Sequence, residues 1–185
     1  MGIPKKQKKI LNLGCGNDTY GTAFVDIYPA RKEVVKCDIN EKTLPYKKNT
    51  FDEVYSKNLF EHLSNPMHIL KESKRVLKRK GRIYFITDNA GFLLFHIPLR
   101  KNNFLQHNSN VLRVGDKDRH YFLFTPLHLI NLIEKCRGFE KIKVTYAYFS
   151  PRKTIKILRP LFNIVNKTFL ARLLNPHLVL EAYKK

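Results

Sequence analysis

The sequence predicts an α/β fold built on a mostly parallel, doubly wound sheet. Short apolar runs of strand length alternate with loops or helical stretches in the first half of the chain, a pattern typical of parallel sheets. Five such runs lie at 9–14, 23–26, 34–38, 51–55 and 82–87. The chain has 185 residues, and no repeat or Pro/Gly/Ser-rich linker divides it. We therefore expect a single domain over residues 1–185.

Apolar spacing and proline at a first helical turn predict two helices. One begins at Pro66 and is expected to end in the basic turn 78–81, where Gly81 supplies a stop; the other runs from Pro126 to Cys136. Strands are expected at 139–149 and 177–183. The segment 89–120 has no clean period and is predicted to be a lid-like insertion after the fifth strand, and a helical insertion is predicted at about 151–175.

Composition limits the class of protein. No apolar run approaches the ~20 residues of a membrane-spanning helix, and the first residues lack the apolar core of a secretory signal. Three cysteines without metal-ligand spacing favour a reducing compartment, so we expect a cytoplasmic protein without a metal site. The net charge of +20 allows nucleic acid or a peripheral anionic membrane as partner. A charged surface that only keeps the protein soluble is the alternative.

The turn after the first strand, Gly14-Cys15-Gly16, is the first candidate site. In open α/β sheets, ligands bind beyond the carboxyl ends of the strands. A dinucleotide motif would need a third glycine where Thr19 stands, which disfavours that ligand. Asp26 and Asp38 close the next two strands. An acidic residue at the second strand end can accept hydrogen bonds from ribose hydroxyls, although Asp38 could also be a turn or cap residue.

Five segments in order resemble class I S-adenosylmethionine-dependent methyltransferases, in particular the small type 11 domains related to quinone-biosynthesis enzymes. They are 10–16 (ILNLGCG), 44–45 (LP), 49–55 (NTFDEVY), 61–63 (EHL) and 75–81 (RVLKRKG). The resemblance implies a Rossmann-like, seven-stranded sheet that ends in an antiparallel hairpin, with S-adenosylmethionine as cofactor. Only residues 17–25 separate the glycine turn from Asp26, so we expect a shortened first helix and an open cofactor site.

The resemblance also implies roles for individual residues. Gly14, Cys15 and Gly16 would cradle the methionine end of the cofactor. Asp26 would hold the ribose, with Ile27 against the adenine. Asp38 and Ile39 would flank the adenine. Lys57, Asn58 and Leu59 would line the sulfonium side.

Methyl transfer to a hydroxyl would gain from a general base, for which histidine is suited. His62 and His120 are the candidates, and Asp88 at the fifth strand end points toward the acceptor side. His62 could instead belong with Glu61 to a structural pair, and His120 could lie in a solvated loop. We expect a small-molecule, lipid-linked or glycan-linked acceptor. An RNA methyltransferase and a catalytically silent cofactor-binding module are the alternatives.

Overall fold

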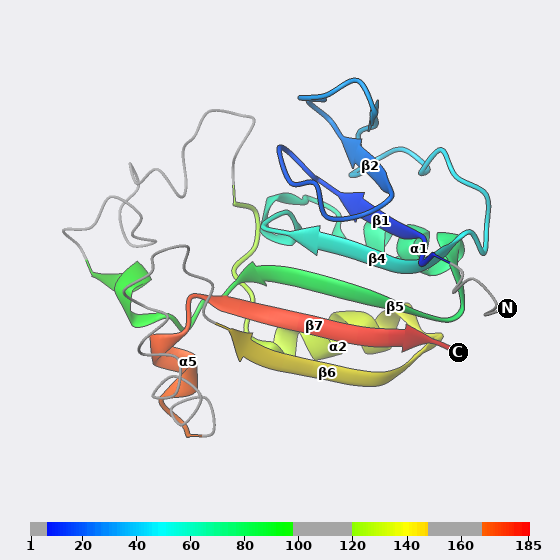
Figure 1. Cartoon of the computed structure of the whole chain (residues 1–185). Coiled ribbons are helices and arrows are strands. Elements are labelled where there is room, and N and C mark those ends of the chain that lie inside the picture. The colour runs from blue at the N-terminus through cyan, green and yellow to red at the C-terminus, as the bar shows by residue number, and fades with distance from the viewer. Residues whose placement is uncertain (1–6, 98–119, 148–167) are drawn as a thin grey trace, which may run out of the picture.

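A computed structural model describes residues 7–97, 120–147 and 168–185 of the chain. Its centre is a seven-stranded sheet with the order β3-β2-β1-β4-β5-β7-β6 (Figure 1). Neighbours from β3 to β5 pair in parallel, whereas β7 lies antiparallel between β5 and β6. The α/β fold class and the C-terminal antiparallel hairpin are thereby confirmed. The strands are β1 (Ile10–Leu13), β2 (Ala23–Asp26), β3 (Val34–Lys36), β4 (Phe51–Lys57), β5 (Leu77–Asp88), β6 (Phe139–Ala147) and β7 (His177–Lys184).

Both longer helices of the described chain pack on one face of the sheet, behind it in Figure 1. They are α1 (Pro66–Val76) and α2 (Pro126–Cys136), and each begins with proline after a side-chain cap, from Asn65 or Thr125. Alternate strand residues such as Leu11, Val54 and Ile83 face these helices and are fully buried. Burial of apolar side chains, at roughly 25 cal/mol per Å², holds this layer together.

The predicted end of the first helix is wrong. The helix stops at Val76, and Leu77 already pairs with Phe51 as the first residue of β5. Gly81 lies inside that strand, where a Cβ would stand 2.9 Å from the carbonyl oxygen of Lys78. The residues expected to form a basic last helical turn therefore extend the strand instead.

The connection from β1 to β2 contains no helix, so the first helix, which we expected to be short, is absent. Instead, the connection runs back along β1. The Thr22 amide donates to the carbonyl oxygen of Ile10 at 2.8 Å, and the side-chain amide of Asn12 donates to the carbonyl oxygen of Tyr20 at 2.9 Å. A helical crossover needs a dozen or more residues, which this connection lacks.

Tyr20 closes part of the sheet face opposite the helices. Its ring lies 4.6 Å from that of Tyr55 between centroids, and its hydroxyl donates to Glu53 Oε1 at 2.9 Å. The other oxygen of Glu53, which is fully buried, accepts from Lys8 at 2.6 Å and from Arg82 at 2.7 Å. Burial alone would raise the pKa of Glu53, but the hydrogen bonds from Lys8, Arg82 and Tyr20 outweigh it and hold the pKa below its ordinary value.

Several expectations lie wholly or largely outside the described residues. Most of the lid-like insertion falls at 98–119, and most of the helical insertion falls at 148–167. The described part of the latter holds the short helix α5 (Ala171–Leu174), and the described part of the former holds the 3-10 turn η2 (Leu93–His96). Among the described residues, no helix has the length and apolar character to cross a membrane.

We predict that Glu53→Gln lowers the free energy of unfolding by about 3 kcal/mol near neutral pH, because Lys8 and Arg82 lose a buried anionic partner. Since the folded-state pKa of Glu53 is depressed, its contribution is complete above the unfolded value of about 4.3 and is lost as the pH falls through the folded value. The free energy of unfolding, measured with urea, should therefore fall less between neutral and acid pH in the variant than in the wild type. Glu134→Gln, at an exposed position of α2, is the control. If acidification lowered the free energy of unfolding equally in both variants, the prediction would be contradicted.

Candidate active site at the carboxyl edge of the sheet

The glycine turn lies where the strand order reverses, since β1 pairs with β2 on one side and β4 on the other. Gly14 and Gly16 have φ values of 61° and 48°, in the left-handed region that favours glycine. A Cβ on Gly14 would stand 2.6 Å from Leu59 Cδ1, so the start of the turn is packed against the end of β4. Above Gly16, by contrast, a Cβ would meet no atom within 4 Å.

Asp26 and the glycine turn are in direct contact. Asp26 Oδ2 accepts a hydrogen bond from the Gly16 amide at 2.8 Å, and Oδ1 accepts from the Tyr28 amide at 2.8 Å. A carboxylate offers about four acceptor positions, so these two bonds fix its orientation and leave capacity for a ligand. Ile27 and Tyr28, which follow, expose 38% and 50% of their surfaces, and apolar surface of this kind suits a flat aromatic group.

Asp38 and Ile39 follow β3 at the same edge. Asp38 Oδ1 accepts from the Asn40 amide at 3.0 Å, which gives this aspartate the turn-forming role considered as the alternative. The Ile39 side chain is only 5% exposed and belongs to the core. If Ile39 contacts the adenine, it would therefore do so through its backbone atoms. Beyond β4, Lys57 and Asn58 are exposed, and Asn58 has a φ of 51° with its amide bound to the carbonyl oxygen of Ile86.

Cys15 is a packing residue. Its side chain is 4% exposed, and burial, reinforced by the negative charge of Asp26, raises the pKa of its thiol. The thiol is therefore protonated near neutral pH and is unsuited to act as a nucleophile.

The candidate acceptor-side residues His62, His120 and Asp88 come together. His62 lies in the 3-10 turn η1 (Phe60–His62), and its ring centroid is 4.3 Å from that of His120, nearly perpendicular to it. His120 Nδ1 is 3.8 Å from Asp88 Oδ2. Sequence reasoning missed a fourth member, His177 of β7, whose Nδ1 is 3.5 Å from Asp88 Oδ1.

The alternative in which Glu61 is structural also has support. Glu61 is 1% exposed and accepts from the Thr87 hydroxyl at 2.7 Å, and its carbonyl oxygen accepts from the Tyr121 amide at 2.9 Å. These bonds fix η1 to β5 and to the segment that carries His120. Glu61 thus positions His62 and His120 beside Asp88. No group of three or more possible metal ligands occurs within the described ranges.

Arg31 is a second residue that sequence reasoning missed. Its guanidinium donates to the carbonyl oxygen of Asp18 at 2.9 Å and to that of Gly16 at 3.4 Å. It therefore braces the glycine turn from the loop between β2 and β3. Its distance along the chain from the turn leaves no local signal that could have identified it.

Known proteins resemble this chain in sequence and in fold. A family model described as a methyltransferase domain matches residues 23–85. An uncharacterised protein of Methanocaldococcus jannaschii is 29% identical over 124 residues, which are 54% of this chain and 54% of that protein. The chain thus spans about half the length of this relative.

Solved methyltransferases share the fold. A S-adenosylmethionine-dependent methyltransferase from Archaeoglobus fulgidus aligns with a TM-score of 0.63 and 18% identity over 96% of this chain and 86% of that one. Phosphoethanolamine N-methyltransferase 2 of Haemonchus contortus, solved in complex with S-adenosyl-L-methionine, aligns with a TM-score of 0.60 and 17% identity over 99% of this chain and 50% of its own.

The strand order and these structures define the fold as that of the S-adenosylmethionine-dependent methyltransferases of class I. The family match over residues 23–85 confirms, more narrowly, the resemblance to the type 11 methyltransferase domain.

We predict that Gly14→Ala destabilises the fold by about 1–3 kcal/mol, because the new methyl group meets Leu59 at a left-handed backbone position. Gly16→Ala should cost only about 1–2 kcal/mol, the left-handed backbone penalty alone. Thermal or urea unfolding measures both. Leu59→Ala should recover part of the loss in Gly14→Ala but none of the loss in Gly16→Ala, and strictly additive effects in both pairs would argue against the packing described.

Proposed function

We propose that this protein binds S-adenosylmethionine at the carboxyl edge of the sheet and transfers its methyl group to an acceptor held beside Asp88. The observation that carries the proposal is the hydrogen bond from the Gly16 amide to Asp26. It joins the two features that the resemblance assigns to cofactor binding, a glycine turn and an acidic strand end, at the point where the strand order reverses.

The residues present fit this cofactor. The space above Gly16 that a Cβ would fill admits a chain as narrow as the methionine part, with Gly14 and Cys15 beneath it. Asp26 has acceptor capacity for ribose hydroxyls, and Ile27 offers apolar surface for the adenine. Asp38 and the backbone of Ile39 would lie at the adenine edge, while Asn58 and Leu59 would border the sulfonium.

S-adenosylmethionine supplies an activated methyl group on a sulfonium, which is displaced in line by the acceptor. The chain's own contribution is to align the acceptor and exclude water, and orientation alone can contribute about 7–11 kcal/mol. At the acceptor side, we assign His120 the role of proton acceptor for a hydroxyl or amine. Asp88 faces His120 and His177 with one oxygen each, so it would orient the imidazole of His120 toward the acceptor.

The acceptor we favour is a small molecule, either free or linked to a lipid or glycan. Apolar surface near the acceptor side supports this. A cavity of about 580 Å³ opens next to Asn89 and is lined by apolar side chains that include Leu93, Leu127 and Leu173. A Haloferax volcanii methyltransferase of the same fold was solved with an activator protein, Trm112 (TM-score 0.56, 14% identity, 96% of this chain and 82% of that one). We include a partner of this kind in the proposal.

Asp26→Asn is expected to weaken S-adenosylmethionine binding by about 10- to 100-fold, because hydrogen bonds to a charged acceptor are worth about 1.5–3 kcal/mol. Isothermal titration calorimetry measures the affinity. Asp52→Asn, at the opposite end of the strands, is the control and should bind like the wild type. A folded wild-type protein that fails to bind S-adenosylmethionine would overturn the proposed function.

Asp88→Asn and His120→Asn should each lower the rate of methyl transfer by about 100-fold or more, the usual contribution of a general base, without changing cofactor affinity. The rate is measured as transfer of radiolabelled methyl groups from S-adenosylmethionine into cell-extract fractions of metabolites, lipids and RNA. His128→Asn, on α2 and outside the cluster, is the control. Label that appears only in RNA would favour the RNA methyltransferase, whereas cofactor binding without labelling of any fraction would favour the silent binding module.

A further inference from the structure

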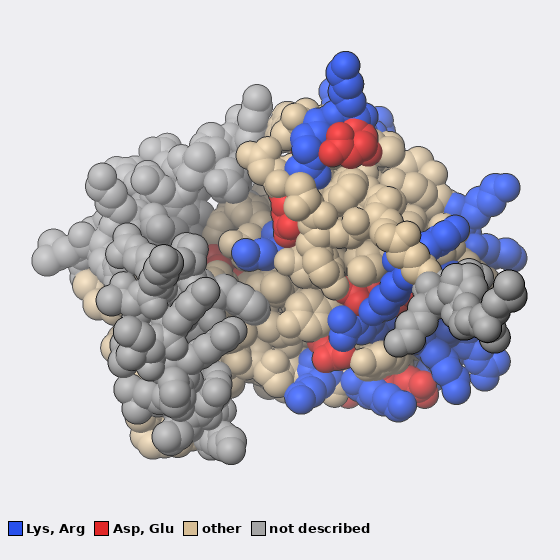
Figure 2. Space-filling view, viewed as in Figure 1, with Lys and Arg blue, Asp and Glu red and all other residues tan. Residues whose placement is uncertain are grey.

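A second surface lies at the opposite end of the sheet, where β4 and β5 begin and β7 ends. Figure 2 shows lysine and arginine side chains gathered on the right of the molecule, the side on which both chain termini lie in Figure 1. We call this surface the basic edge and define it by its cationic residues, which line one cavity or contact its lining: Lys8, Lys78, Arg79, Lys80, Arg82 and Lys141.

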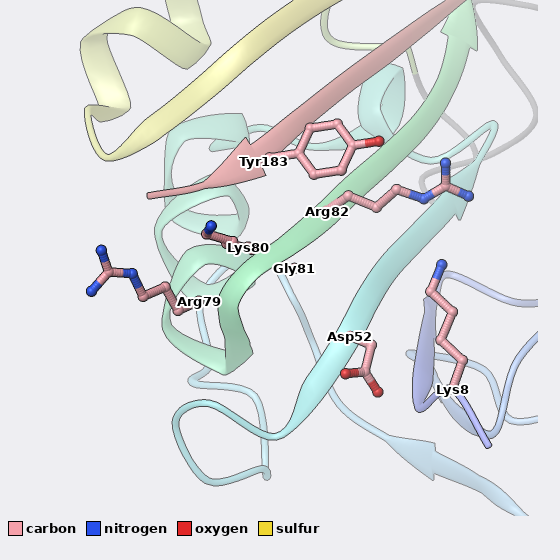
Figure 3. Close-up of a pocket in the computed structure, with 7 residues that line it drawn as sticks. All are labelled: Lys8, Asp52, Arg79, Lys80, Gly81, Arg82 and Tyr183. Atoms are coloured by element: carbon pink, nitrogen blue, oxygen red, sulfur yellow. The ribbon is translucent and has the colours of Figure 1, made fainter. Parts of the chain in front are cut away.

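The basic edge is hollowed by a cavity of about 360 Å³. Figure 3 shows its lining, which comes from the chain before β1 and from β4, β5 and β7. The cationic side chains are those of Lys8, Arg79, Lys80 and Arg82. Tyr183 adds an aromatic ring, and Asp52 is the acidic member of the lining. Four cations around one carboxylate favour an anionic ligand.

The acidic groups in and beneath this cavity are already occupied by cations. Asp52 pairs with Lys78 at 2.7 Å. Glu53 forms ion pairs with Lys8 and Arg82, and Arg82 also pairs with Glu181 at 3.2 Å. Arg79 and Lys80 are exposed, and no carboxylate pairs with either of them in the part of the chain that the structure describes. Their charges are therefore open to an external anion.

The backbone provides an independent indication. Lys80 has a φ of 60° and Lys141 a φ of 51°, positions in the left-handed region where glycine or asparagine is preferred. A lysine there carries a conformational cost that glycine would avoid. Charge is thus present at two positions of the basic edge where local backbone energetics favour another residue.

From these observations we propose that the basic edge binds the phosphodiester backbone of a nucleic acid. From β1 to β6 it crosses four strand spacings, about 19 Å at ~4.8 Å each, whereas successive phosphates lie about 3.4 Å apart along a strand axis. It therefore fits a polyanion rather than a single phosphate. Tyr183 lies in the lining with Lys141 Nζ 5.9 Å from its ring centroid, and an aromatic side chain of this kind can stack on a base. The proposal does not depend on methyl transfer.

A membrane surface fits this edge less well. Peripheral binding usually combines basic residues with apolar side chains that enter the headgroup region. Among the described residues, the large hydrophobic side chains that are exposed, such as Leu127 and Phe169, are none of those that line the cavity. The attraction at the basic edge is therefore electrostatic, as in contacts with phosphates.

The test measures binding of the full-length protein to a fluorescent single-stranded RNA of about 20 nucleotides and to a duplex DNA of equal length, at several salt concentrations. We expect binding that weakens as salt rises. The double variant Arg79→Gln/Lys80→Gln should bind roughly 10-fold more weakly at about 0.1 M salt, and its salt slope should fall by about 1.4 for a single strand, because each phosphate contact contributes about 0.7. The RNA and DNA arms tell which nucleic acid is preferred.

The matched control is Lys71→Gln/Lys135→Gln, which removes the same charge from exposed positions of α1 and α2. It should retain wild-type affinity, and equal weakening in both double variants would overturn the proposal by showing an effect of net charge alone. Lys80→Gly serves as a second variant, since it should bind more weakly without lowering the melting temperature. Absence of nucleic-acid binding, or binding only to vesicles of anionic lipid, would also overturn the proposal.

Discussion

The contact between the β1–β2 connection and β1 itself determines much of this structure. Asn12, 1% exposed, donates its side-chain amide to the carbonyl oxygen of Tyr20, and Thr22 bonds with Ile10. Because the chain returns directly along β1 before β2 begins, Asp26 at the end of β2 lies beside the glycine turn. Its carboxylate there accepts a hydrogen bond from the Gly16 amide. The same return path places Tyr20 over Tyr55 and beside Glu53, so one short connection both shapes the glycine turn and closes part of a sheet face.

The two faces of the sheet are stabilised by different interactions. Toward α1 and α2, the strands present a continuous apolar core, whose stability depends on buried area and packing. On the other face, a small apolar cluster around Tyr55 and Ile86 adjoins the buried Glu53 with its cationic partners. Such an ionic network is sensitive to the loss of any partner. The absence of a helix between β1 and β2 is thus accompanied by polar interactions rather than by a second apolar layer.

Local sequence signals predicted the parallel strands, the proline-led helices and the position of the glycine turn and Asp26 at strand ends, because each rests on a short pattern or on the general geometry of strand ends. They failed where a partner distant in sequence decides the outcome. Leu77 becomes a strand residue because Phe51 pairs with it. His177 joins Asp88 only through the antiparallel register of β5 and β7, and Arg31 reaches the glycine turn from another loop. None of these pairings leaves a trace in the spacing of residues along the chain.

Strand β5 extends from Leu77 to Asp88 and so connects the two proposed binding regions. From Lys80 to Asp88 it covers eight residue steps, about 26 Å at ~3.3 Å per residue. Because the strand is rigid, it fixes the separation between the basic edge and Asp88. A ligand anchored at Lys80 would present its own reactive group at Asp88 only if it extended around the molecule by more than this span. Shorter anchored ligands would instead leave the acceptor position accessible to a separate, smaller molecule.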